Sequence, residues 1–267
     1  MNMKKIAIIT GASSGMGRQF AIKIDRMLKS IDEIWLIARR MELLEEVRGE
    51  INRPCRLICE DVTDESYKYV LAKILRQENV EIKMLVNCAG YGIIGEADSE
   101  AIEVEVGMAE TNCSGLTVTT LVAIPYMSSN SRIINIASSA AFLPQPYFAI
   151  YAASKSYVLS FSRALRRELY DRGIVVTAVC PGPVDTEFFS IAEKGSKRAW
   201  FKDLTMATAD EVVEQALTDS INKKEISVYG VTMKMFRIFT KLVPHKLILD
   251  SYGKFYKKNH NEMTREN

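Results

Sequence analysis

A tyrosine, a lysine and a serine in the middle of the chain have the types and spacing of an acid-base site. Tyr151 and Lys155 are four residues apart, and Ser138 lies upstream of both. Positions four apart share one face of a helix, so the phenol and the ammonium group can point into one cleft. A free phenol has a pKa of about 10, and a cation about 4 Å away is worth roughly three pKa units at an effective dielectric of about 20. We therefore expect Lys155 to lower the pKa of Tyr151 toward neutral pH.

The tyrosine-lysine spacing has little specificity by itself, because Tyr69 and Lys73 repeat it. A chain with eleven tyrosines is expected to contain such a pair by accident. Tyr69 lies in a charged stretch with no unusual residues before it, which favours a solvated helix face. Tyr151 follows an apolar segment that ends at Ser138, and this context makes it the catalytic candidate.

Length and charge predict one large domain that acts on a small molecule. The 267 residues suffice for a single α/β domain over 1–267, with its core at about 4–230. The net charge of +2 comes from 35 basic and 33 acidic residues, which gives no case for nucleic-acid binding.

Several features favour a cytoplasmic protein without a metal centre. The chain shows no signal peptide and no run of roughly 18 apolar residues, so we expect neither export nor a membrane span. Its scattered cysteines are expected to be reduced and buried: Cys55, Cys59, Cys88, Cys113 and Cys180. Cys55 and Cys59 have the wrong gap for a CxxC site, and the only histidines are His245 and His260, so we predict no zinc site.

Short apolar runs alternate with longer amphipathic segments along the chain. We predict strands at Lys4–Thr10, Glu33–Ala38, Arg56–Glu60, Lys83–Asn87, Arg132–Ala137 and Ile174–Cys180, with a seventh at about Glu225–Tyr229. Runs that are apolar on both faces are typical of buried parallel strands, and the segments between them supply crossover helices. The expected fold is a Rossmann-type, doubly wound parallel sheet of about seven strands, with helices on both faces. Ligands bind such sheets at the carboxyl ends of the strands.

The first strand is followed by a glycine-rich turn and a helical pattern. Gly11, Gly15 and Gly17 permit a tight turn and a close approach of the backbone to a pyrophosphate. Residues 11–15 also satisfy the G-x-S-x-G pattern of a hydrolase, with Ser13 as nucleophile. That reading is disfavoured because the hydrolase elbow follows several earlier strands, and here none precedes it.

The ends of the later strands carry further candidates for a dinucleotide site. Arg39, with Arg40, follows Ala38 where a dinucleotide site contacts the adenosine ribose, and a guanidinium there suits the 2′-phosphate of NADP(H). The alternative is that both arginines are plain exposed charges. Asp61 follows the third strand and is a candidate acceptor for the adenine amino group. The turns at 87–90 and 181–186 complete this edge, although each alone also fits an ordinary turn.

Taken together, these residues resemble the short-chain dehydrogenase/reductase family over about residues 4–230. The match consists of TGxxxGxG at 10–17, Asp61-Val62, Asn-x-Ala-Gly at 87–90, Asn112, Ser138, Tyr151-x3-Lys155 and Pro181-Gly182, in order and at the family spacing.

The resemblance implies a role for each catalytic position. Tyr151 is the general acid that protonates a carbonyl oxygen, and Ser138 hydrogen-bonds the same oxygen. Lys155 lowers the tyrosine pKa and binds the nicotinamide ribose, and Asn112 holds a water that links Lys155 to solvent. Ser139 is the neighbouring candidate, but the family spacing favours Ser138.

The resemblance also implies a cofactor site and an assembly. The implied cofactor residues are Gly11, Ser13, Ser14, Gly15, Met16, Gly17, Arg39, Arg40, Asp61, Val62, Asn87, Ala89, Gly90, Tyr151, Lys155, Pro181, Gly182, Val184 and Thr186. A homodimer or homotetramer is expected. The chain departs from the family at Cys88, where an asparagine is usual, and at Ser14, where some NADP-dependent members carry a basic residue. Arg39 and Arg40 are left to bind the phosphate, so we expect a clear but not absolute preference for NADP(H).

Aromatic residues predict the substrate end. Phe188, Phe189 and Ile191 lie in a segment at about 187–205 that is expected to form a lid, and the opposite wall is expected from Pro144, Pro146, Tyr147 and Phe148. We hypothesise a bulky apolar ketone or alcohol such as a steroid, a bile acid or a long-chain acyl compound, by analogy with hydroxysteroid dehydrogenases. The alternatives are ordinary core packing of these rings, a reductase of acyl or small carbonyl compounds, and a non-enzymatic NADPH-sensing protein.

The segment at about 231–258 is basic and amphipathic. Lys234, Arg237 and Lys241 recur at helical spacing, with Met235, Phe239 and Leu242 on another side. Such a segment can lie on a membrane surface. Packing against the protein's own pocket or against a second subunit is the favoured alternative.

Overall fold

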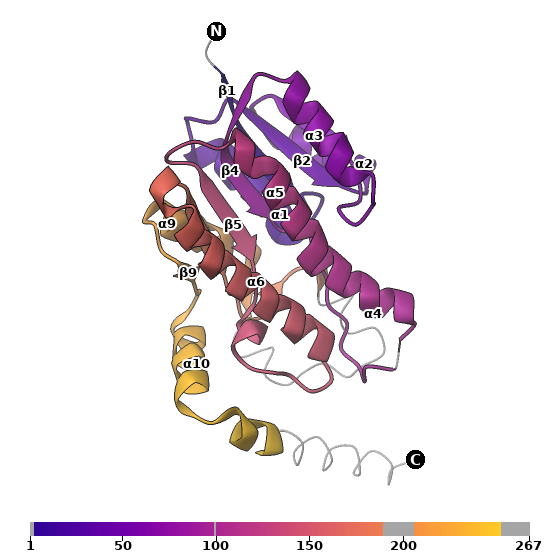
Figure 1. The fold of residues 1–267 in the computed structure, drawn as a ribbon, viewed down its shortest axis with the longest axis vertical. Coiled ribbons are helices and arrows are strands. Elements are labelled where there is room, and N and C mark those ends of the chain that lie inside the picture. Colours follow the sequence, from indigo (N-terminus) through magenta and orange to yellow (C-terminus); the bar gives the residue numbers. More distant parts are fainter. Residues whose placement is uncertain (1–2, 99, 189–205, 252–267) are drawn as a thin grey trace.

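The computed structural model describes residues 3–98, 100–188 and 206–251 and contains one large parallel sheet (Figure 1). Among these residues the sheet has seven strands in the order β3-β2-β1-β4-β5-β6-β9. The strands are β1 (Lys4–Thr10), β2 (Glu33–Ala38), β3 (Cys55–Cys59), β4 (Val80–Asn87), β5 (Arg132–Ile136), β6 (Val175–Val179) and β9 (Ile226–Ser227). All seven predicted strands are confirmed, with ends that shift by a few residues.

Helices cover both faces of the sheet. One face is covered by α1 (Gly15–Met27), α2 (Met41–Gly49) and α9 (Ala209–Ile221), which share an apolar cluster with the strands. The other face is covered by α3 (Tyr67–Gln77), α5 (Leu116–Ala123) and α6 (Ala149–Glu168). This is the doubly wound, Rossmann-type architecture that the alternation of segments predicts.

The strand β1 shows why these runs become central strands. Ile6 and Ile8 pack into the cluster on one face, whereas Ala7 and Ile9 pack into the cluster on the other. All four side chains are fully buried. Successive side chains of a strand point to opposite faces, so only a run that is apolar throughout can bury both.

The carboxyl ends of the strands form one edge, where the unusual residues gather. Thr10, at the end of β1, pairs in register with Asn87 of β4, and Asn87 pairs with Asn135 of β5. The Thr10 hydroxyl accepts hydrogen bonds from the backbone N–H groups of Cys88 (3.1 Å) and Ala89 (3.2 Å). A polar residue at the end of one strand therefore fixes the turn that follows its neighbour.

The structure contains three features that the sequence did not predict. A second, two-stranded sheet joins β7 (Val184–Asp185) to β8 (Ala207–Thr208). A π-helix at Glu110–Gly115 separates α4 (Ile102–Ala109) from α5, and a 3₁₀-helix at Ser139–Phe142, η3, follows β5. The remaining elements are the 3₁₀-helices η2 (Ile124–Tyr126) and η4 (Tyr170–Arg172) and the C-terminal helix α10 (Val231–Leu242).

The second tyrosine-lysine pair lies on the surface. Tyr69 is in α3 and is 64% exposed, and the Lys68 ammonium lies 5.0 Å from the centre of its ring. Tyr67 of the same helix faces inward instead, where its hydroxyl meets the Thr119 hydroxyl at 3.0 Å. The solvated-face interpretation of Tyr69 and Lys73 is therefore confirmed.

Candidate active site

The helix α6 carries Tyr151 and Lys155 on one buried face. Tyr151 is in its first turn and Lys155 is one turn further, and both side chains are buried, although they are polar. The Lys155 ammonium lies 5.5 Å from the centre of the Tyr151 ring. Its Nζ donates a hydrogen bond to the carbonyl oxygen of Ile136, at the end of β5, at 2.9 Å. The helix and the strand end together orient the lysine.

Ser138 follows the end of β5 and lies next to Tyr151. It precedes η3 and caps it, because its hydroxyl accepts a hydrogen bond from the N–H of Ala140 at 3.1 Å. The side chains of Ser138 and Tyr151 are also hydrogen-bonded to each other. Ser139 is held by its backbone, whose N–H donates to the Pro181 carbonyl at 2.8 Å. The structure thus brings Ser138 to the phenol.

Burial determines the protonation of the phenol, in the direction opposite to our expectation. Removal from water raises the pKa of Tyr151 to about 12, although its hydrogen bond with Ser138 acts to lower it. The expected lowering by Lys155 is therefore wrong for this structure, in which the ammonium bonds to a backbone carbonyl instead. A phenol with this pKa is protonated at neutral pH, which is the form that a general acid needs.

Burial also shifts the pKa of the lysine. Removal from water lowers the pKa of Lys155 to about 8, while the nearby thiols of Cys88, Cys113 and Cys180 oppose this shift. Lys155 is therefore close to its titration point near neutral pH. A titratable group with so large a shift, in contact with an acid-base candidate, is typical of functional sites.

Asn112 lies beside the lysine in the π-helix between α4 and α5. Its amide nitrogen donates to the Tyr91 carbonyl (2.9 Å) and to the Ser154 hydroxyl (3.0 Å), and its oxygen accepts from the Tyr91 N–H (3.0 Å). Single π-turns inside helices are frequent at functional sites. The extra residue turns Asn112 toward the loop after β4, and its side chain fastens that loop next to Lys155.

The glycine-rich turn has the close backbone approach that the sequence predicts. Gly11 has a φ of 63°, and a Cβ there would lie 2.7 Å from the backbone nitrogen of Ala89. A Cβ at Gly17 would overlap the carbonyl oxygen of Gly11. Larger residues at either position would force the turn away from its neighbours. The N-terminus of α1 stays open toward the strand edge and is suited to an anion.

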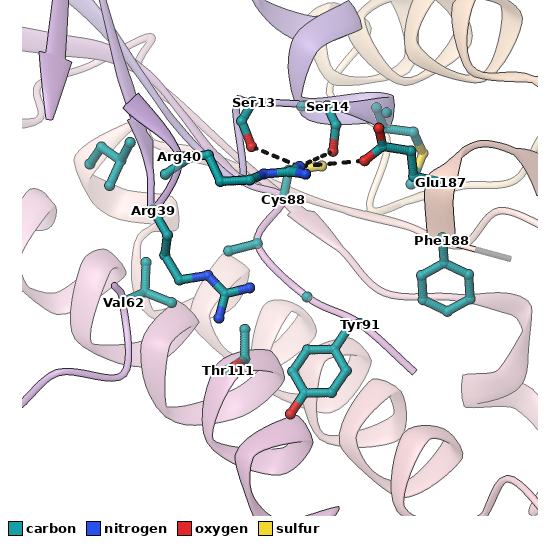
Figure 2. Close-up of a pocket in the computed structure, with 18 of the residues that line it drawn as sticks. Ser13, Ser14, Arg39, Arg40, Val62, Cys88, Tyr91, Thr111, Glu187 and Phe188 are labelled. Carbon is teal, nitrogen blue, oxygen red and sulfur yellow. Dashed lines mark hydrogen bonds and ion pairs between the residues drawn. The ribbon is translucent and has the colours of Figure 1, made fainter. Parts of the chain in front are cut away.

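A cavity of about 450 Å³ opens at this edge (Figure 2). It is lined by most of the predicted cofactor residues: Gly11, Ser13, Ser14, Gly15, Met16, Gly17, Arg39, Arg40, Asp61, Val62, Ala89, Gly90 and Thr186. The six others do not line it. Asn87 is buried and bonds to Thr120 and Asn135, and Val184 is in the core. Pro181, Gly182, Tyr151 and Lys155 also lie outside its wall.

The two arginines at the cavity mouth have different partners, and Figure 2 shows those of Arg40. The Arg39 guanidinium lies 3.4 Å from the Asp61 carboxylate. The Arg40 guanidinium lies 3.3 Å from the Ser14 hydroxyl, 3.4 Å from the Ser13 hydroxyl and 3.4 Å from the Glu187 carboxylate. Arg40 therefore connects the glycine-rich turn to the segment after β7, across the mouth of the cavity.

Asp61 is held as a carboxylate. Burial acts to raise its pKa, but hydrogen bonds from the backbone and hydroxyl of Thr63 (3.0 and 2.8 Å) and the charge of Arg39 lower it below its ordinary value. An ionised acceptor at the end of β3 is available to a donor in the cavity.

Aromatic rings surround the phenol. The rings of Phe148 and Tyr151 are stacked, with centres 4.2 Å apart, and the Phe188 ring lies 5.4 Å from Tyr151. Phe189 and Ile191, which we expect in the lid, fall outside the described residues. Tyr147 has a φ of 62°, and its carbonyl accepts a hydrogen bond from Gly95 at 2.9 Å. Pro144 and Pro146 precede it, and their place in the opposite wall stays a prediction.

Several cavity residues are absent from the predicted cofactor residues. They are Ile37, Ala38, Glu60, Cys88, Tyr91, Ile93 and Thr111, together with Glu187 and Phe188, which we expect in the lid. Gly92 is also missing, although a Cβ there would lie 2.7 Å from the Tyr151 ring and 2.8 Å from the Phe148 ring. A second glycine shortly after Gly90 was an available signal for this close approach, and Thr111 directly precedes Asn112.

Comparisons with known proteins agree with this geometry. The profile of the short chain dehydrogenase family matches residues 5–197. Sulfoacetaldehyde reductase 2 of Chromohalobacter salexigens is 32% identical over 79% of this chain and 86% of its own length. Serine 3-dehydrogenase of Agrobacterium fabrum is 29% identical over 86% of this chain and 94% of its own.

Solved structures share the fold. The closed form of a serine dehydrogenase complexed with NADP+ has a TM-score of 0.72 at 26% identity, covering 85% of this chain and 95% of its own. A short chain dehydrogenase/reductase from Burkholderia phymatum in complex with NAD has a TM-score of 0.74 at 20% identity, covering 88% and 92%. The chain therefore belongs to the short-chain dehydrogenase family, as an oxidoreductase that acts on alcohol or carbonyl groups with a nicotinamide cofactor.

Proposed function

We propose that the protein is an NADP(H)-dependent oxidoreductase that interconverts a ketone and a secondary alcohol, with Tyr151 as general acid and base. The observation that carries this proposal is the buried contact between Tyr151 and Ser138 beside Lys155. A carbonyl oxygen placed between two hydroxyl donors is stabilised as negative charge develops on it. The protonated phenol then gives its proton to that oxygen, and takes it back in the reverse reaction.

The cavity fits a dinucleotide on structural grounds. It combines a close-packed glycine turn, an open helix N-terminus, two guanidinium groups and a carboxylate. The nicotinamide supplies or accepts the hydride when it is bound. Of the residues near this end, Lys155 is proposed to bind the ribose and to stabilise the tyrosinate that forms after proton transfer.

We propose that Asn112 assists the proton transfer by holding the loop beside Lys155 in place. Its side chain is engaged with the backbone of Tyr91 and with Ser154, so it holds the loop at Gly90 close to the Lys155 ammonium. A Cβ at Gly90 would lie 3.4 Å from Lys155 Nζ. A water that relays protons from Lys155 to solvent remains part of the proposal and would bind beside this loop.

The arginine contacts support a preference for NADP(H). Arg40 lies over Ser13 and Ser14, close enough to meet a phosphate near the glycine turn, and Arg39 stands at the end of β2. Each guanidinium also has a carboxylate neighbour, Glu187 or Asp61, that a phosphate has to replace or share. Competition from these carboxylates explains why we propose a clear but not absolute preference.

Removal of Arg40 tests this preference. We expect Arg40→Ala to raise the KM for NADPH by about tenfold, as for loss of one charge-assisted hydrogen bond, and to leave the KM for NADH nearly unchanged. Arg76→Ala, on α3, is the matched control. Steady-state kinetics with both cofactors decide the question. A wild-type kcat/KM that is higher with NADH than with NADPH contradicts the proposed preference.

The substrate is proposed to be bulky and apolar, such as a steroid, a bile acid or a long-chain acyl compound. The support is the set of rings around the phenol, Phe148 and Phe188, together with Ile93 at the cavity wall. The named relatives act on serine or sulfoacetaldehyde, which favours a second candidate, a reductase of small carbonyl compounds. The side chains with a printed ring contact to Tyr151 are the apolar Phe148 and Phe188 and the ammonium of Lys155, which favours the apolar substrate.

A pair of substrate panels separates these candidates. We expect kcat/KM for polycyclic ketones to exceed that for small charged aldehydes by at least about tenfold, because each buried apolar group adds about 1 kcal/mol or more of discrimination. Phe188→Ala is expected to reduce this ratio. NADPH oxidation in the presence of each compound provides the measurement. Activity confined to small charged carbonyls contradicts the apolar substrate and favours the second candidate.

A further inference from the structure

The helix α10 turns its apolar side away from the protein. Val231, Met235, Ile238, Phe239 and Leu242 are between 48% and 76% exposed. At about 100° per residue these five positions fall within an arc of about 100° on the helix. A surface helix of a globular protein normally buries that arc against the core.

Residues on the other side of α10 pack against the rest of the protein. Thr240 is buried, and the Arg237 guanidinium lies 6.0 Å from the Phe142 ring of η3. Met233 packs against Gly182, near the end of β6. These contacts leave the opposite side of α10 pointing outward, and Figure 1 shows the helix standing away from the sheet and its covering helices.

Basic residues border one side of the exposed apolar arc. Lys234 and Lys241 are exposed and seven residues, or about two helical turns, apart at this margin. Residues 231–251 contain four lysines or arginines and a single acid, Asp250. After Pro244 the chain is helical again from His245, and Leu247 there is 59% exposed. An exposed apolar side chain and the exposed Lys246 therefore also follow α10.

We propose that this face of α10 docks on an anionic lipid surface. An in-plane helix with an apolar arc and lysines at its margin can bury the apolar side chains at the lipid boundary and place the lysines against anionic headgroups. No helix among residues 3–98, 100–188 and 206–251 is long and apolar enough to cross a membrane.

The charges argue for lipid over a second copy of the chain. Two α10 helices that paired antiparallel through their apolar arcs would bring their lysine margins to the same side of the pair, and like charges that face each other are destabilising. Within residues 231–251, Asp250 is the only carboxylate available to offset them. An anionic membrane instead attracts each lysine near its surface.

Vesicle sedimentation tests the proposal on the full-length protein. We expect binding to phosphatidylcholine vesicles that contain about 30% phosphatidylserine, weak binding to phosphatidylcholine alone, and release at about 0.5 M salt. Lys234→Glu/Lys241→Glu and Ile238→Asp/Leu242→Asp are each expected to weaken binding by at least about tenfold. Lys29→Glu/Lys73→Glu, which reverses two exposed charges elsewhere, is the control and should bind like the wild type.

Two readouts keep the test independent of folding and of assembly. Thermal unfolding and NADPH binding should be the same in all variants, because the changed side chains are exposed and lie outside the cofactor cavity. Absence of sedimentation with anionic vesicles overturns the proposal, as does equal binding by Lys234→Glu/Lys241→Glu. A dimer in sedimentation velocity that Ile238→Asp/Leu242→Asp converts to a monomer, without vesicle binding by the wild type, assigns the face to a second copy and also overturns it.

Discussion

Replacing Tyr151 by phenylalanine is expected to lower kcat by about 10²- to 10⁴-fold while NADPH binding is unchanged. The substitution removes the hydroxyl that bonds to Ser138 and keeps the ring that stacks on Phe148 at 4.2 Å. The apolar packing therefore survives, and the loss reports on the proton donor alone. Steady-state turnover and NADPH fluorescence titration measure the two quantities.

Tyr69→Phe is the matched control for this change. Tyr69 also has a lysine four residues later, but it is 64% exposed on α3. We expect its removal to alter neither kcat nor NADPH binding. Equal activities of wild type and Tyr151→Phe would contradict the role of the phenol, and equal losses in both tyrosine variants would point to a general effect on the protein.

Replacing Gly92 by alanine is expected to lower kcat by about 10²-fold, because it displaces the reacting groups. A Cβ at this position would lie 2.7 Å from the Tyr151 ring and 2.8 Å from the Phe148 ring. Gly92 has no positive φ, so the backbone accepts alanine and the cost is steric. Turnover of the variant at saturating NADPH, together with its NADPH affinity, provides the measurement.

Gly49→Ala provides the control for this steric effect. Gly49 lies at the end of α2, and a Cβ there would meet nothing within 4 Å. We expect this variant to keep the wild-type kcat and stability. A Gly92→Ala protein with full activity would show that the two rings are not held in the close packing on which the site depends.

The sheet could be predicted from the sequence because buried parallel strands require apolar side chains on both faces. Ile6 to Ile9 of β1 meet this requirement at every position and admit few other structures. The strands β7 and β8 escaped prediction because each is two residues long and lies outside any apolar run, with Asp185 and Thr208 as their second residues. The equally short β9 could be predicted because it lies within the mostly apolar stretch at 226–229. The π-turn at Asn112 also carries no periodic signal.

Much of the candidate site could be predicted for a similar reason. Gly11 and Gly17 lie where another part of the backbone comes too close for a Cβ, so only glycine fits there and the sequence reveals the contact. The contact between Arg40 and Glu187 could not be predicted, since it joins segments almost 150 residues apart along the chain. Contacts of this kind depend on how loops meet in space.

The pKa values of the catalytic pair show another limit of the sequence. Spacing places Lys155 one turn from Tyr151, and a pairwise calculation then lowers the phenol pKa. In the fold both groups are buried, which raises the pKa of Tyr151 to about 12 and lowers that of Lys155 to about 8. Desolvation depends on everything that packs around a group, and sequence spacing does not contain it.

The most direct test of the account is whether the wild-type protein turns over at all with NADPH and a carbonyl substrate. A mixture of polycyclic ketones, NADPH and the purified protein should consume NADPH and form one alcohol per NADPH, with kcat of about 1 s⁻¹ or more on the best compound. Product analysis by mass spectrometry checks the stoichiometry. NADPH binding without oxidation by any ketone or aldehyde in the panels would contradict the account and would identify the protein as an NADPH-binding protein without chemistry.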